Sequence, residues 1–185
     1  MSDSVFSYKP FGFRSFFNGK SQPFDNSVPL FTSRGYTYVL RDDINQNTDL
    51  IDKWKVIISK TSAEHAGQSD NEGKKRILSR VVALSPGKIS SETYLLLRCF
   101  DTEKDAENLV YYLKTRFVRF LLSTVLLTQN IAKDKFCFIP IQDFTSKSDI
   151  DWGKSVSEID SQLYAKYGLT EKEISFIESM IKEME

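Results

Sequence analysis

The spacing of apolar residues along this chain changes once, near residue 101. Before that point, short runs rich in apolar and β-branched residues are separated by polar or glycine-bearing stretches, a pattern typical of strands and turns. After it, apolar residues recur at i, i+3 and i+4, the period of an amphipathic helix. The pattern predicts an α/β protein of the α+β type, with a mixed β-sheet, one long central helix and a C-terminal pair of helices.

The strands expected from this pattern are short. They cover residues 36–40, 54–59, 77–84 and 93–100, followed by a last buried strand over 136–141. About the first 35 residues are aromatic and rich in turn formers. The polar stretch 60–76 contains two glycines and no apolar period, so a long exposed loop is expected there.

The helices have recognisable ends in the sequence. The central helix is expected over 102–124, because Thr102 can cap its start and apolar residues follow at helical spacing. Near the C-terminal end, Gly168 is placed to end one helix, and Thr170 with Glu173 has the spacing of a capping box at the start of the next.

With 185 residues, the chain is long enough to bury a core without disulfides or metals. We expect a sheet-containing domain over residues 1–145 and a helical appendage over 146–185 that packs on it. The net charge is zero, but residues 1–140 carry 20 Lys and Arg against 15 Asp and Glu, whereas residues 141–185 carry 5 against 10. This asymmetry indicates a binding face in the front part; the alternative is ordinary solvated surface charge.

Few catalytic groups are available. Nucleophilic catalysis needs a nucleophile within reach of a base, and the one histidine, His65, lies in the polar stretch 60–76, where a solvated side chain is expected. One histidine and two cysteines cannot form a Cys/His metal set. No phosphate-binding glycine motif occurs, and the strands 54–59 and 93–100 contain no acidic residue for a metal-dependent nuclease.

The chain is expected to be cytoplasmic, with no membrane partner. The N-terminus lacks the charged start and apolar run of a signal peptide, and no run of 18 apolar residues occurs. Cys99 and Cys137 lie in apolar runs, where a free cysteine behaves as a small hydrophobic residue.

Several spaced motifs in the second half of the chain occur in the same order in one known family. They are "SETYLLLRCF", "YYLKTRFVRFLL", "FCFIPIQDF" and "LYAKYGLTEKEISFIESMIKEME", and they cover most of residues 91–182. In these motifs the chain resembles the C-terminal target-recognition region of bacterial restriction–modification N6-adenine DNA methyltransferases, the type II bifunctional restriction–modification enzymes. "FGFRSFFNGK" and "WKVIISK" resemble the entry to the same region more loosely.

The resemblance implies a DNA sequence-recognition domain. Such a domain would position double-stranded DNA for an upstream methyltransferase domain or subunit, which would bind S-adenosylmethionine. The Asn-Pro-Pro-Tyr type motif and the glycine-rich cofactor loop of that family are absent from this sequence. No catalytic residue, metal or cofactor is therefore assigned to this chain, which is expected to correspond to the C-terminal piece of a larger protein.

Within this resemblance, DNA contacts are expected from loop cations, because Lys and Arg neutralise phosphates and Arg reads guanine. In "FGFRSFFNGK", Phe11, Phe13 and Phe17 are expected to share a core face, while Gly12 and Gly19 let the backbone turn or approach DNA. The candidate DNA-binding residues are Arg14, Lys20, Arg34, Lys60, Lys74, Lys75, Arg76 and Lys88. Arg116 and Arg119 on the central helix are expected to be structural.

Two other functions remain open at this point. The chain could be a protein-interaction module that docks through its acidic helical tail, in which case no salt-dependent DNA binding is expected. It could also be a nuclease with an unrecognised site, which would require magnesium and acidic residues.

Gln68 and Asn71 in the stretch 60–76 are further candidates for reading bases, because amide side chains pair with adenine.

Overall fold

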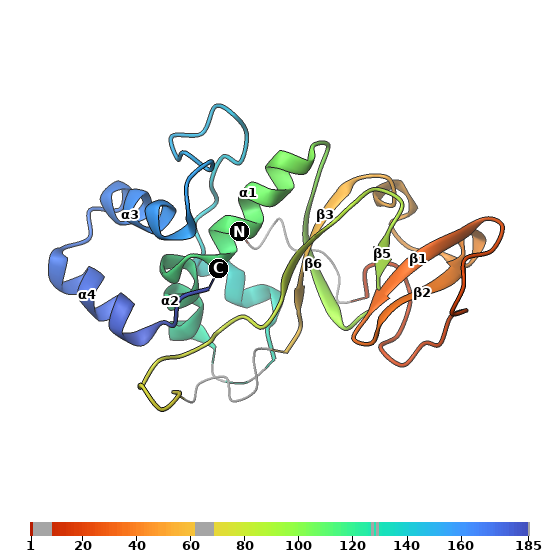
Figure 1. Cartoon of the computed structure of the whole chain (residues 1–185), viewed down its shortest axis with the longest axis horizontal. Helices are drawn as coiled ribbons and strands as arrows, with labels where there is room; N and C mark the ends of the chain where they lie inside the picture. Colours follow the sequence, from red (N-terminus) through yellow and green to blue (C-terminus); the bar gives the residue numbers. More distant parts are fainter. Residues whose placement is uncertain (2–8, 62–68, 127, 129, 185) are drawn as a thin grey trace.

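The computed structural model describes residues 1, 9–61, 69–126, 128 and 130–184, which form an α+β protein. A three-stranded sheet lies at one end of the molecule and helices lie at the other, with a second three-stranded sheet between them (Figure 1). The end sheet has the order β2–β1–β5, with β1 (Ser27–Thr32), β2 (Gly35–Leu40) and β5 (Ile89–Ser90). The middle sheet has the order β4–β3–β6, with β3 (Trp54–Ser59), β4 (Val81–Leu84) and β6 (Tyr94–Phe100).

The middle sheet is covered on both faces. Alternate residues of a strand point to opposite faces. In β3, Val56 and Ile58 therefore join a buried cluster shared with the helices, whereas Ile57 joins a second cluster shared with the end sheet. This explains the uninterrupted apolar run of β3, since a strand buried on both faces has no polar alternation.

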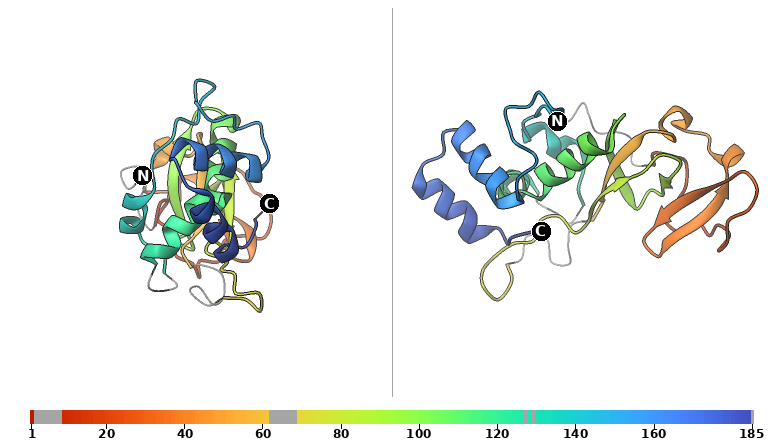
Figure 2. Two further views of the ribbon diagram at one scale, coloured as in Figure 1. Left: turned by 90° about the vertical axis from the view of Figure 1, so that its left-hand side faces the viewer. Right: turned by 45° about the horizontal axis from the view of Figure 1, so that its top comes forward.

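Two halves follow from these two clusters. The helical half comprises the four α-helices and the side of the middle sheet that faces them. The sheet half comprises the β2–β1–β5 sheet, the segment 9–26 and the other side of the middle sheet. The helices are α1 (Glu103–Lys114), α2 (Arg116–Val125), α3 (Val156–Lys166) and α4 (Glu171–Met180). In two views, α4 and the β1–β2 hairpin lie at opposite ends of the molecule (Figures 1 and 2).

The expected single helix over 102–124 is corrected: it is two helices, because Thr115 adopts an extended conformation between α1 and α2. The Thr115 hydroxyl donates to the Tyr112 carbonyl (2.6 Å) and accepts from the Val118 N–H (3.3 Å). The new helix start exposes two further N–H groups, of Arg116 and Phe117, and both donate to the carboxylate of Asp160 on α3 at 2.9 Å. A side chain distant in sequence therefore stabilises the break.

The ends of the last two helices agree with the sequence. Gly168 follows α3 with a positive φ of 66°, the conformation that favours glycine after a helix. Ser155 with Glu158 caps α3, and Thr170 with Glu173 caps α4, each as a complete capping box. Gly168 and the box at Thr170 are local signals that the sequence predicts, whereas the box at Ser155 was not expected.

Two expectations about strands are corrected. Residues 136–141 do not form a strand; Lys133–Phe138 is a 3₁₀ helix in which Phe136 is buried, while Cys137 and Phe138 are exposed. In the turn-rich front part, the stretch SVPLFT forms β1, which pairs with β2 and, in parallel, with β5. The strand β1 depends on pairing partners that a local pattern does not contain.

Candidate nucleic-acid interface

The outward face of the β2–β1–β5 sheet combines cations with aromatic rings. Phe31 of β1 and Tyr36 of β2 are cross-strand partners with ring centroids 5.0 Å apart. The Lys88 ammonium lies 5.4 Å from the centroid of Tyr36, and the Arg80 guanidinium lies 5.8 Å from the centroid of Phe31. Such distances are those of cation–π contacts, which hold the charges over the rings while leaving them available to an anion.

Tyr94 connects this face to the middle sheet. Its ring stacks on Phe31 at 4.9 Å, its hydroxyl accepts a hydrogen bond from Arg80 at 3.1 Å, and the same hydroxyl donates to the Thr32 carbonyl at 3.4 Å. Burial, with a smaller effect of the Tyr94 hydroxyl, raises the pKa of Tyr36. Tyr36 therefore stays a neutral phenol that can donate a hydrogen bond.

The segment "FGFRSFFNGK" belongs to the sheet half, and its phenylalanines divide into a buried and an exposed group. Phe11 and Phe13 are buried in the sheet-half cluster, whereas Phe16 is 75% exposed and Phe17 is 38% exposed. The expectation that Phe17 shares a fully buried face with the other two is therefore corrected; its ring packs edge-on against Phe13 at 4.9 Å. The segment is a surface as well as a core edge.

Both glycines of this segment are required by close packing on the protein itself. Gly12 has a φ of 88°, and a Cβ there would lie 2.5 Å from the side-chain oxygen of Asn45. A Cβ on Gly19 would lie 2.5 Å from the backbone oxygen of Tyr38, beside which Lys20 pairs with β2. The two glycines thus hold the segment against the sheet.

The exposed side chains line two adjacent clefts. One cleft of about 110 Å³ lies at the tip of the β1–β2 hairpin and is lined by Ser15, Phe16, Phe17, Asn18, Gly19, Thr32, Arg34, Tyr36 and Thr37. The other, of about 460 Å³, shares Phe17 with the first and includes Lys20 and Asp43. Lys20 also lies over the Phe24 ring, at 4.2 Å from its centroid. Three of the predicted cations, Lys20, Arg34 and Lys88, therefore border one aromatic surface, and Arg14 is exposed in the segment next to it.

The remaining four predicted cations lie elsewhere. Lys60 follows β3 and is partly buried, and this burial lowers its pKa. Lys74, Lys75 and Arg76 lie on the helical half, where the Lys75 N–H donates to the Met180 carbonyl at 2.8 Å and the Lys75 carbonyl accepts from the Lys182 N–H at 3.1 Å. Asp70 and Lys74 are joined by backbone hydrogen bonds, so residues 70–76 are fixed at their C-terminal end. His65 and Gln68 lie outside the described residues.

The arginines of α2 are structural, as expected. Arg116 is paired with Glu183 at 3.0 Å and Glu178 at 3.6 Å. Arg119 is fully buried and donates to the backbone oxygens of Lys114, Thr115 and Lys182. Burial lowers the pKa of Arg119 to about 10, which leaves it charged at neutral pH.

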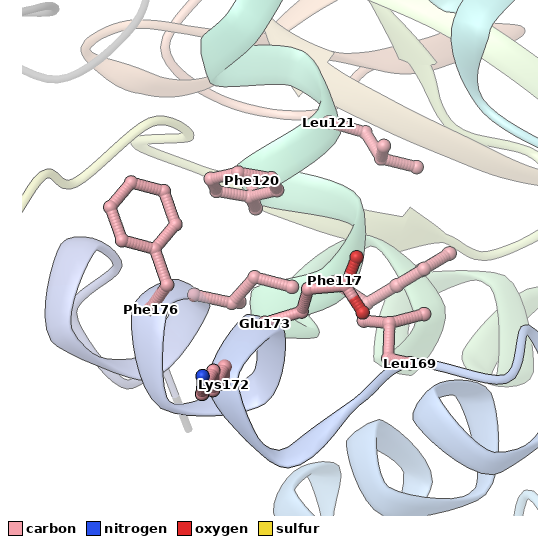
Figure 3. A pocket seen from close by; sticks show the side chains of 8 residues that line it. Phe117, Phe120, Leu121, Leu169, Lys172, Glu173 and Phe176 are labelled. Atoms are coloured by element: carbon pink, nitrogen blue, oxygen red, sulfur yellow. The ribbon is translucent and has the colours of Figure 1, made fainter.

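A second surface lies on the helical half, between α2 and α4. It is a largely apolar groove of about 460 Å³, lined by Phe117, Phe120, Leu121, Leu169, Lys172, Glu173, Phe176 and Ile177 (Figure 3). Phe176 is 55% exposed and packs edge-on against Phe120 at 5.9 Å. The Glu173 carboxylate is held at the start of α4, where it accepts from the Thr170 N–H.

Sequence reasoning missed Arg80, Tyr36 and Phe16. Arg80 lies in a stretch expected to be strand, and Tyr36 was expected only as part of a strand. The one available signal was the cluster of aromatic residues next to Arg14, which is unusual for a purely structural segment. Among the residues that the structure describes, no three metal-binding side chains come together, and no helix has the length and apolar character needed to cross a bilayer.

The fold defines an α+β protein with a cation–aromatic surface at one end and an apolar groove at the other. In comparisons with models of protein families, with curated proteins and with solved structures, no match to this chain was found. The role of the chain is therefore inferred from the residues of these two surfaces.

Proposed function

We propose that this chain contacts double-stranded DNA and serves as a sequence-recognition domain of a restriction–modification adenine DNA methyltransferase. The observation that carries the proposal is the outward face of the sheet half. There Arg34 and Lys88 border the exposed rings of Phe16 and Tyr36, and Arg80 lies over the partly buried ring of Phe31. The motif order described above supports the same function. S-adenosylmethionine and the methyl transfer would belong to a methyltransferase domain or subunit outside this sequence.

The chemistry of docking follows from charge and shape. Cations over aromatic rings can neutralise DNA phosphates and release the counterions bound there, which makes affinity fall steeply with salt. Arg34, exposed at the tip of the hairpin, can reach a base edge, where a bidentate contact to guanine discriminates by about 1–3 kcal/mol. The domain itself would then align DNA, and the flipping and methylation of the adenine would occur in the partner domain.

Fluorescence anisotropy with random-sequence duplex DNA at several salt concentrations tests the proposal. We expect wild-type binding to weaken steeply with salt. The double variant Arg34→Ala/Lys88→Ala should weaken binding and reduce the slope of log K against log salt by about 1, since the phosphate contact of Lys88 contributes about 0.9 and Arg34 is assigned to a base edge. Lys74→Ala/Arg76→Ala removes the same charge from the helical half and serves as the matched control. Equal losses from both pairs, or no binding at low salt, would contradict the proposal.

The groove between α2 and α4 favours a second candidate, a protein-docking module. Its occupant would be an amphipathic helix with basic flanks, because the tail over 141–185 has an excess of five acidic residues and α4 carries Glu171 and Glu178 on exposed positions. A synthetic helix with leucines at i, i+3, i+4 and i+7 and lysines elsewhere is a suitable probe. Binding that Phe176→Ser abolishes, together with an absence of salt-dependent DNA binding, would favour this candidate.

A further inference from the structure

Phe16 occupies the corner of a tight turn. The Phe17 N–H donates to the Arg14 carbonyl at 3.1 Å, which places Ser15 and Phe16 at the two central positions of a β-turn. Phe16 is 75% exposed, more than any other large hydrophobic side chain found exposed among the described residues. No ring contact of Phe16 is present in the described part of the chain. The sheet half thus presents one aromatic ring directly to solvent.

The turn that carries this ring is anchored on both sides. Before it, the Glu92 N–H donates to the Phe13 carbonyl at 2.9 Å, and the Ser15 N–H donates to the Glu92 carboxylate at 3.3 Å. After it, Lys20 and Tyr38 exchange two backbone hydrogen bonds of 2.9 Å. The ring therefore projects from a fixed backbone, and its position is set before any ligand arrives, which lowers the entropy lost on binding.

The surroundings of the ring are suited to nucleic acid. Arg14 precedes it, Arg34 and Tyr36 face it across the 110 Å³ cleft, and none of the residues that line this cleft is acidic. The Glu92 carboxylate, beside this turn, accepts a hydrogen bond from the Ser15 N–H. A protein partner would match an exposed phenylalanine with an apolar pocket, whereas a ring that shares its cleft with the Arg34 guanidinium matches a base with a phosphate beside it.

We propose that Phe16 is a wedge that enters the base stack when the cationic face of the sheet half docks on duplex DNA. This inference rests on the proposed function and specifies how the surface engages DNA. Apolar side chains inserted between base steps unstack them and kink the duplex, and the added contact offsets the cost of unstacking. The ring would stack on one base, and the open cleft between Phe16 and Tyr36 leaves room for the base edge that is displaced.

The test uses the full chain with Phe16→Ala, and Phe176→Ala as the matched control. Phe176 is another exposed phenylalanine, but it lies on α4, at the opposite end of the molecule from the β1–β2 hairpin (Figure 1). Phe16→Ala should weaken duplex binding about tenfold, the effect of losing one base–aromatic stack. Its salt slope should stay unchanged, because no charge is removed. Because Phe16 is exposed, the melting temperature of the variant should equal that of the wild type.

Unstacking itself can be read directly. A duplex with 2-aminopurine at its pyrimidine–purine steps, which unstack most easily, should become more fluorescent with wild type and with Phe176→Ala, but not with Phe16→Ala. A duplex with one mismatched pair should bind more tightly than the perfect duplex, and only Phe16→Ala should lose this preference. If wild type binds DNA with salt dependence, and Phe16→Ala shows the same affinity, fluorescence change and mismatch preference, the wedge is wrong and the proposed function stands. If wild type shows no salt-dependent binding, the proposed function fails.

Discussion

The sheet half and the helical half use their cations in opposite ways. In the helical half, Arg119 is fully buried with its charge directed at backbone carbonyls, and Arg116 is shared by two glutamates. In the sheet half, Lys88 lies over the exposed ring of Tyr36, 5.4 Å from its centroid. A cation whose donors are used by its own fold contributes to stability, whereas a cation over an exposed ring remains available to a ligand. Charge counts alone do not separate these two uses.

The largest expected effect is a loss of stability in the helical half. Asp160→Ala removes the acceptor of two N–H groups at the start of α2 and the carboxylate nearest to the buried Arg119. We expect the free energy of unfolding to fall by about 4 kcal/mol, because two N–H donors at the start of α2 lose their acceptor and the buried Arg119 loses a favourable negative charge. Urea denaturation measures it. Asp160→Asn keeps one acceptor oxygen and should lose clearly less; an equal loss in both variants would contradict the role assigned to the N–H bonds.

The next effect is a pH dependence of the same half. Burial raises the pKa of Asp160 to about 6, although two N–H bonds and two arginines act in the opposite direction. The folded protein therefore keeps a proton that the unfolded chain releases near pH 4. The stabilising contribution is full below pH 4 and is lost as pH rises through 6, up to about 3 kcal/mol in total. The stability of wild type relative to Asp160→Asn should fall between pH 4 and 6. A pH-independent difference would show that Asp160 titrates normally.

The smallest effect concerns the sheet half. Gly19→Ala would place a methyl group 2.5 Å from the backbone oxygen of Tyr38, so the segment carrying Phe16 has to shift away from β2. We expect a loss of about 1–2 kcal/mol in unfolding free energy, together with weaker DNA binding, since the turn is no longer held in place. Gly153→Ala on the helical half, where the nearest contact is the flexible side chain of Asp151 at 3.2 Å, is the control. Unchanged DNA binding in Gly19→Ala would show that the turn position is irrelevant.

Sequence reasoning succeeded where the signal is local. The strands β3 and β6 and the capping boxes of α4 and α3 depend on residues within a few positions of one another, although only the box at Thr170 was expected from the sequence. The break between α1 and α2 depends on Asp160, 44 positions away from Arg116, so no local pattern contains it. A local period could not have predicted this tertiary partner.

The candidate site likewise combines features that are local in the sequence with features that depend on long-range contacts. The loop cations stay a prediction from residue type, and which of them share a surface depends on long-range pairing. Residues 9–20 pair with β2 and with Glu92, which lies 77 positions from Ser15. Lys55 is a cation whose burial the local sequence does not reveal. It lies in the apolar strand β3, is fully buried, and donates to the carbonyls of Ile51 and Lys53 at 2.6 Å. Burial lowers its pKa to about 8.

The positions of the two tryptophans give the helical half an optical reporter of its own. Trp54 and Trp152 are the only tryptophans of the chain, and both pack in the cluster of the helical half. The cluster of the sheet half contains Phe and Tyr rings but no tryptophan. Tryptophan emission therefore follows the environment of the helical half alone, and a ligand that binds only the outward face of the sheet half should leave the tryptophan signal constant.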